Sequence, residues 1–125
     1  MRGLLVVLAV LVVVPVALAL PGKGIYKGRE SASTVTVAAD GRTLTAVKLA
    51  PRRQPAACKL KNPVLTKLKL NAAGLLVYKT TRPNTAGKPL KLTVRIEFFT
   101  PYLGDVSATY RGAGCSFAFG DTVVK

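Results

Sequence analysis

The sequence predicts an all-β protein: an antiparallel β-sandwich or small β-barrel of about seven to nine short strands, with one disulfide. Three observations lead to this prediction. Residues 90–99, LKLTVRIEFF, alternate between apolar and polar side chains, as a strand does when one face packs on a core and the other meets water. Turn-forming Gly, Asn, Asp and Pro recur along the chain, and two cysteines stand far apart.

Residues 1–19 have the features of a secretory signal peptide. A short basic start is followed by the unbroken apolar run 4–14, and Ala17 and Ala19 are small residues at the spacing that a signal peptidase accepts. We therefore expect cleavage after Ala19.

Residues 20–125 would then form a single all-β domain, secreted to the extracellular space or the cell envelope, with no membrane span. The alternative is an uncleaved anchor, because residues 4–20 approach the shortest length that crosses a bilayer. Pro15 interrupts that segment, and only one basic residue precedes it, so we expect secretion.

The first part of the domain predicts a short strand and a hairpin. Residues 24–28 read as a strand with glycine at both ends, and residues 33–39 and 42–49 are strand-like runs on either side of Asp40-Gly41. Asp-Gly favours a type I′ turn, in which both central residues take positive φ. The sequence therefore predicts a two-residue hairpin here.

The register of this hairpin follows from its side chains. If the turn is centred on Asp40-Gly41, Val37 lies opposite Leu44 and Val35 lies opposite Ala46, with threonines on the other face. An apolar face and a polar face are what a half-buried hairpin requires.

Residues 50–63 contain three prolines and are expected to be an irregular crossing. They carry Cys58, whose default partner in a secreted chain is Cys115, the only other cysteine. Closing a loop of about 58 residues would stabilise the fold by about 4 kcal/mol. A reactive or metal-binding thiol is the alternative, but the chain has neither a CxxC motif nor a histidine.

A second hairpin is predicted from residues 64–70 and 75–80, joined by the turn at 71–74. This pairing would place Leu68 opposite Val77 on an apolar face. The segments beyond it are predicted as a loop at 81–89, strands at 90–99, 105–111 and 115–119, and a short final strand at 122–124.

The net charge of +14, or +13 once Arg2 is removed with the signal peptide, predicts attraction to polyanions. Nucleic acid, anionic cell-wall polymers and acidic lipid headgroups are the candidate partners. The alternative is that the charge only keeps the protein soluble.

Basic residues crowd one part of the chain, where Tyr78 could add stacking. If the second hairpin packs beside the crossing, they form one positive surface suited to phosphate groups. The alternative is a scattered basic surface without a specific ligand, since no nucleic-acid-binding motif is present. The candidate anion-binding residues are Arg52, Arg53, Lys59, Lys61, Lys67, Lys69 and Tyr78.

Enzymatic chemistry is not expected. The chain has no histidine and only five acidic residues, so the usual general base and most metal sites are missing. Glu97 lies two residues from Arg95 on the outward face of its strand, which predicts a surface ion pair of little energetic consequence. No catalytic, metal-binding or cofactor-binding residue is predicted.

Several features together resemble a known group of proteins. They are Gly24-x-Tyr26-x-Gly28, the segment VTVAADGRTLTAV, a cysteine after that hairpin, and DVSATYRGAGCSF with the second cysteine. Over residues 24–119 the chain resembles a family of small secreted bacterial domains, of the actinobacterial type, whose function is unknown. The resemblance implies an extracellular β-sandwich and assigns no functional residue. Related chains often end in a tryptophan-bearing strand, which residues 120–125 lack.

The sequence therefore predicts a secreted, non-enzymatic binding or structural module of the cell envelope that attracts anionic polymers. One alternative is a protein-binding module, an inhibitor or adhesin, that presents the loop at 81–89 or at 50–57. Another is a small hydrolase, which substitution of Glu97 or Asp105 would reveal.

Overall fold

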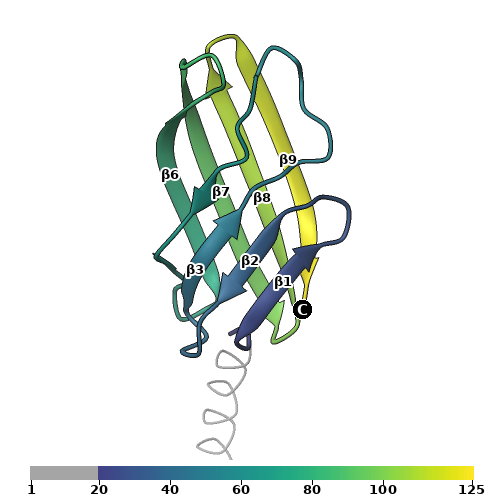
Figure 1. Ribbon diagram of the computed structural model, residues 1–125. Coiled ribbons are helices and arrows are strands. Elements are labelled where there is room, and N and C mark those ends of the chain that lie inside the picture. The colour runs from purple at the N-terminus through teal and green to yellow at the C-terminus, as the bar shows by residue number, and fades with distance from the viewer. Residues whose placement is uncertain (1–19) are drawn as a thin grey trace, which may run out of the picture.

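The computed structural model describes residues 20–125, and the predicted signal peptide at 1–19 lies outside them. The described chain is all-β with one disulfide, as predicted (Figure 1). No helix in this part of the chain is long and apolar enough to cross a bilayer. The strands are β1 (Gly24–Gly28), β2 (Thr34–Val37), β3 (Thr43–Lys48), β4 (Val64–Leu65), β5 (Leu68–Lys69), β6 (Leu75–Pro83), β7 (Pro89–Thr100), β8 (Leu103–Gly112) and β9 (Cys115–Val124).

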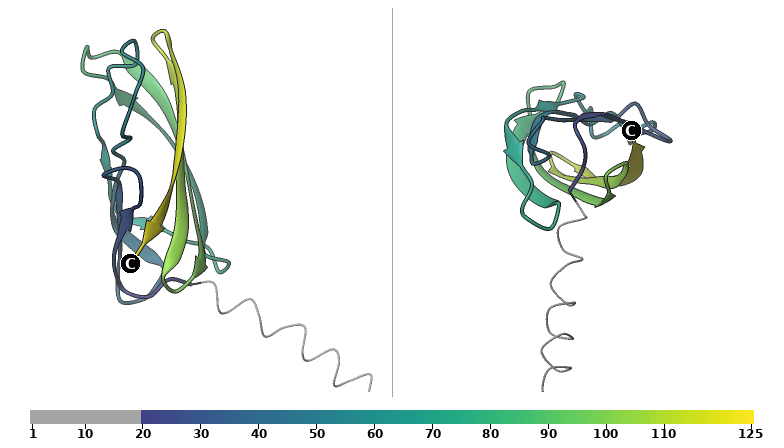
Figure 2. Two further views of the ribbon diagram at one scale, coloured as in Figure 1. Left: turned by 90° about the vertical axis from the view of Figure 1, so that its right-hand side faces the viewer. Right: turned by 90° about the horizontal axis from the view of Figure 1, so that it is seen from below.

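The nine strands form one continuous antiparallel sheet in the order β4-β3-β2-β1-β9-β8-β7-β6, with β5 also paired to β3. The sheet curls into a half-barrel, so that β1–β3 lie across the core from the long strands β7–β9 (Figure 2). The structure therefore combines features of the two predicted alternatives. Two halves of a single curled sheet take the place of the two layers of a sandwich.

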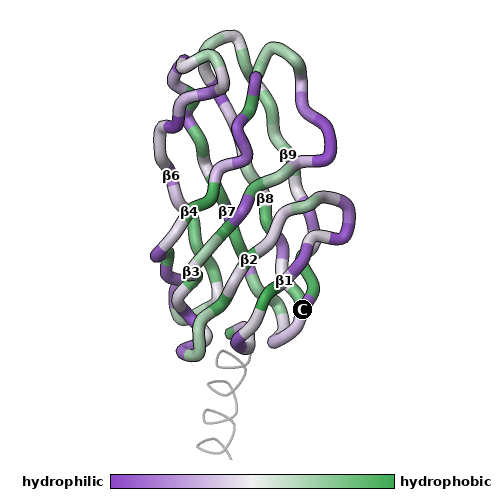
Figure 3. The backbone as a smooth tube through the Cα atoms, viewed as in Figure 1, coloured by the Kyte–Doolittle hydropathy of each residue, from purple (hydrophilic) through white to green (hydrophobic). Residues whose placement is uncertain are grey.

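Strand β7 is the alternating segment of the sequence, and it lies between β6 and β8 in the sheet. The apolar residues at every second position from 90 to 98 are buried and the polar residues between them face outward, and the alternation is visible along the long strands (Figure 3). The buried set consists of Leu90, Leu92, Val94, Ile96 and Phe98. The predicted orientation of this strand is confirmed.

The predicted register between β2 and β3 is correct at one end and wrong at the other. Val37 lies opposite Leu44 as expected, but Val35 lies opposite Val47 and not opposite Ala46. A β-bulge at Thr45 causes the shift, because Leu44 and Val47 are three residues apart and both are fully buried. Strict alternation could not bury both side chains, and the extra residue of a bulge allows it.

The turn of this hairpin also differs from the predicted type I′ turn. Gly41 takes a positive φ of 69°, whereas Asp40 does not have a positive φ. The Ala38 N–H donates to the Thr43 carbonyl, so the loop is four residues long. The Asp40 carboxylate accepts the N–H groups of Arg42 and Thr43 at 2.9 and 2.8 Å, and these bonds hold the longer turn closed.

The predicted second hairpin is wrong, although its turn is present. The Gly74 N–H donates to the Asn71 carbonyl at 3.0 Å, but β4 and β5 pair with β3 while β6 pairs with β7. Lys67 takes a positive φ of 58° between β4 and β5 and interrupts the expected strand. Residues 71–74 therefore form the corner at which the chain passes from one half of the sheet to the other.

The hairpins formed by β6 with β7 and by β8 with β9 are longer than predicted. Strand β6 continues to Pro83 and faces Pro89 of β7, so both ends of the loop predicted at 81–89 belong to the sheet and only 84–88 remain as the turn. Proline is tolerated here because β6 is an edge strand. The strands predicted at 115–119 and 122–124 are one strand, because β8 pairs with β9 without a break from Cys115 to Val124.

Residues 49–63 form the predicted irregular crossing, which we call the crossing loop. It passes over the ends of β8 and β9 that β1–β3 do not cover (Figures 1 and 2). Leu49 and Leu60 from this loop are buried in the core. The predicted disulfide between Cys58 and Cys115 is confirmed, with 4.6 Å between the Cα atoms, and it fixes the loop to the start of β9.

Candidate functional site

The basic residues predicted to bind anions are all exposed, but they come from separate parts of the surface. Arg52 and Arg53 lie in the crossing loop and line a cleft with Phe117 and Phe119 of β9. The rings of Phe117 and Phe119 are stacked, with centroids 6.1 Å apart. Aromatic side chains therefore do lie beside arginines, but β9 supplies them.

Tyr78, the aromatic residue predicted for this surface, lies elsewhere. It is half-buried on β6 opposite the fully buried Val94, on the inner face of the sheet. Lys67 and Lys69 were expected beside it, but Lys69 pairs with Thr43 on β3 because the second hairpin does not form. Tyr78 is therefore not placed to stack on a ligand that is held by the predicted basic residues.

Lys59 and Lys61 follow the disulfide in the crossing loop. Lys61 lines a narrow cleft together with Arg82 of β6. This pair brings together two cations that are far apart in the sequence, and it depends on the crossing loop lying against the edge of the sheet.

A different set of cations is assembled on the outer face of β6, β7 and β8, and we call it the basic outer face. Six side chains occupy two adjacent rows of the sheet. In one row Lys79 lies opposite Thr93, which lies opposite Thr109; in the next, Thr81 lies opposite Lys91, which lies opposite Arg111. They line one open groove of about 430 Å³, and no acidic residue lines it.

The basic outer face has no internal charge compensation in the part of the chain that the structure describes. The only ion pair within residues 20–125 joins Arg95 and Glu97 at 3.1 Å, as the sequence predicted. Lys91 and Arg111 are direct cross-strand neighbours, an arrangement that is destabilising for like charges. An anion lying between them would remove this repulsion.

Sequence reasoning missed the basic outer face because it grouped cations by their position along the chain. Lys79 and Lys91 belong to two strands of one hairpin, and Arg111 comes from the next strand. The alternation of 90–99 already showed which of its residues face outward. Applying the same alternation to the two neighbouring strands could have revealed this surface, but only with knowledge of how the three strands pair.

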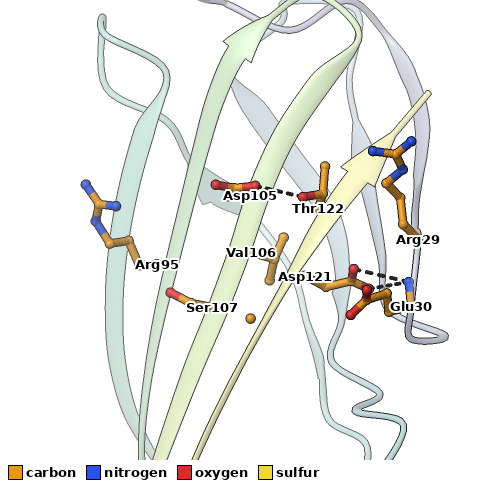
Figure 4. Close-up of a pocket in the computed structure, with 9 residues that line it drawn as sticks. Arg29, Glu30, Arg95, Asp105, Val106, Ser107, Asp121 and Thr122 are labelled. Atoms are coloured by element: carbon orange, nitrogen blue, oxygen red, sulfur yellow. Dashed lines mark hydrogen bonds between the residues drawn. The ribbon is translucent and has the colours of Figure 1, made fainter.

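A separate, polar cleft lies where β8 and β9 meet the loop between β1 and β2 (Figure 4). Its acidic side chains are Glu30, Asp105 and Asp121, and Arg29 and Arg95 lie at its margins. The Thr122 hydroxyl donates to Asp105 at 3.2 Å. Among the described residues, no group of three or more His, Cys, Asp or Glu is placed to hold a metal ion.

Asp121 is buried and holds the loop between β1 and β2 in place. Its carboxylate accepts the Ser31 hydroxyl at 2.6 Å, the Ser31 N–H at 2.9 Å and the Glu30 N–H at 3.2 Å. Burial raises the pKa of Asp121, but these hydrogen bonds and one from the Thr122 backbone outweigh it and lower the pKa below 3.8. Its oxygens are thus engaged by the fold itself, which gives this acid a structural role.

The chain was compared with protein-family models, with curated proteins and with solved structures, and none of them matches it. The resemblance to small secreted bacterial domains therefore stays a prediction, and the function has to be inferred from the surfaces described above.

Proposed function

We propose that this protein is an exported, non-enzymatic binding module of the cell envelope that holds anionic polymers on its basic outer face. The observation that carries the proposal is the placement of Lys79, Lys91 and Arg111 at adjacent positions of the sheet, in a groove that no acidic residue lines. Phosphate-bearing polymers, such as teichoic acid or nucleic acid, have the complementary chemistry.

The spacing of the basic outer face supports this choice of ligand. Neighbouring strands lie about 4.8 Å apart and successive outward residues along a strand about 6.7 Å apart, so the cations form a flat array and not a single deep pocket. A flat array suits a repeating chain of charges, and the threonine hydroxyls between the cations can bond to phosphate oxygens. Binding of this kind weakens steeply as salt is added.

The test is a salt titration of two triple variants with equal net charge changes. The slope of log K, where K is the association constant for DNA, against log salt is negative. We expect K79Q/K91Q/R111Q to make it shallower by about 2 to 3, because each phosphate contact contributes about 0.9. The matched control K59Q/K67Q/K69Q should make the slope shallower by less than about 1. Heparin and teichoic acid serve as further polymers.

An equal effect of the two triple variants on all three polymers would overturn the proposal, because it would make the overall charge, and not this face, the cause of binding. A preference for one polymer that persists near physiological salt, and that only K79Q/K91Q/R111Q removes, would identify the ligand class.

A second candidate function is a protein-binding module, an inhibitor or adhesin, that presents the turn between β6 and β7. One observation favours it: the tip of this turn is rigidly held. Asn84 is buried, and its side chain donates to the Cys58 carbonyl and accepts the N–H groups of Ala86 and Lys88. Salt-tolerant binding to a protein that is lost when residues 84–88 are replaced would support this function.

A further inference from the structure

The cleft lined by Lys61 and Arg82 opens at the free edge of the half-barrel, between the crossing loop, the end of β6 and the start of β7. Its volume is about 270 Å³, slightly below the usual range for drug-sized ligands. The walls are mainly apolar and come from both sides of the opening. The apolar lining residues are Leu60, Pro63, Pro83, Leu90 and Leu92, and Asn62 lines the cleft beside them.

Tyr110 of β8 lines the same cleft, and its hydroxyl is unusual. The side chain is 3% exposed, and the hydroxyl oxygen has no hydrogen-bond partner within residues 20–125. Buried polar groups are nearly always paired, so an unpaired one calls for an explanation. Burial also raises the pKa of Tyr110 to about 12, which keeps the hydroxyl protonated and able to donate.

The charged residues of this cleft are both cationic. Lys61 lines it from the crossing loop and Arg82 lines it from β6, and no acidic side chain is among its lining residues. Both are exposed, whereas Leu90 and Leu92 are buried. The cleft therefore combines apolar walls with cations and a hydroxyl that lacks an acceptor.

We propose that this cleft binds a short-chain fatty carboxylate. The alkyl chain would pack on Leu60, Leu90 and Leu92. The carboxylate would accept a hydrogen bond from the Tyr110 hydroxyl. It would also pair with the ammonium group of Lys61 and the guanidinium group of Arg82, both of which suit a carboxylate. The small volume selects a single short chain of about the length of octanoate.

This inference does not depend on the proposed function. The polymer site uses Lys79, Lys91 and Arg111 on the outer face, whereas the carboxylate site uses residues that line the opening of the half-barrel. Either site can therefore fail its test while the other passes.

The experiment measures binding of octanoate to the protein by calorimetry and by the methyl shifts of Leu60, Leu90 and Leu92. We expect saturable binding at one site. Y110F should weaken it by roughly tenfold to a hundredfold through loss of one hydrogen bond to a charged group. It should also raise the Tm of the ligand-free protein by about 4 °C, because it removes an unpaired buried hydroxyl.

Three controls make the test specific. Y102F changes an exposed tyrosine and should leave both affinity and Tm unchanged. K61Q/R82Q should weaken binding of octanoate but not of octanol, whereas K67Q/K69Q should affect neither. Absence of saturable octanoate binding, equal binding of octanol and octanoate, or undiminished affinity of Y110F would each overturn the proposal.

Discussion

At the scale of single residues, Asp121 shows how the fold uses one of its few acids. The carboxylate reaches from β9 to the loop between β1 and β2 and ties together segments about 90 residues apart in the chain. Gly28 leaves the space for it, since a Cβ on that residue would collide with the Asp121 carboxylate. A buried carboxylate with several donors stabilises a protein only while it is charged.

We therefore predict a pH-dependent cost for D121N. Because the folded-state pKa is lowered below 3.8, the carboxylate stabilises the protein fully above that value and less as the pH falls through the folded-state pKa. The variant should lose about 1–3 kcal/mol of unfolding free energy at pH 7, and the deficit should shrink at pH 3. Urea denaturation at the two pH values measures it.

The control for this prediction is D105N, which changes an exposed acid with one hydrogen bond to Thr122. It should alter stability by no more than about 0.5 kcal/mol. An equal loss for D121N at pH 7 and pH 3 would show that shape, and not charge, is what Asp121 contributes.

At the scale of elements, β7 is the strand on which the sheet depends most. It pairs along almost its whole length with both β6 and β8, and its inner face contributes five buried side chains to the core. Lys91 and Thr93 on its opposite side belong to the basic outer face. The two faces can therefore be changed separately, one to test stability and the other to test binding.

We predict that I96A lowers the free energy of unfolding by about 2–5 kcal/mol, because Ile96 is fully buried and the substitution leaves a cavity. T93A, on the opposite face of the same strand, should cost less than about 1 kcal/mol. Chemical denaturation of both variants measures the difference. Similar losses for the two would contradict the assignment of faces.

At the scale of the whole molecule, the half-barrel is closed unequally on its two sides. β1 and β9 join the two halves of the sheet through only two residue pairs, and on the other side β4 and β6 end the sheet without pairing to each other. The crossing loop covers the ends of β8 and β9 that β1–β3 leave open, and the disulfide holds that loop to β9. The same arrangement creates the cleft lined by Lys61 and Arg82.

We predict that the double variant C58A/C115A loses about 4 kcal/mol of unfolding free energy, because the disulfide closes a loop with a sequence separation of 57. The measurement is thermal unfolding of the oxidised protein, the reduced protein and the variant. Octanoate binding should weaken in the variant as well, since the crossing loop forms one wall of the cleft. A variant with unchanged Tm would show that core packing alone holds the loop.

The strands that sequence reasoning predicted best are those whose pattern is local. The alternation of 90–99 fixed which side chains of β7 are buried, and Asn71 and Gly74 marked a turn that is present. The errors arose where a partner decides the outcome. The runs at 64–70 and 75–80 are both strand-like, but nothing in either says that the first pairs with β3 and the second with β7.

The sequence by itself determined the all-β class, the orientation of β7, the cysteine pair and the excess of positive charge, because periodicity, residue type and composition are properties of the chain alone. Only the tertiary structure decided the bulge at Thr45, the curl of one sheet into a half-barrel, and the two groups of cations on its surface. These depend on which strands become neighbours. That choice is made by the burial of side chains from distant segments in one common core.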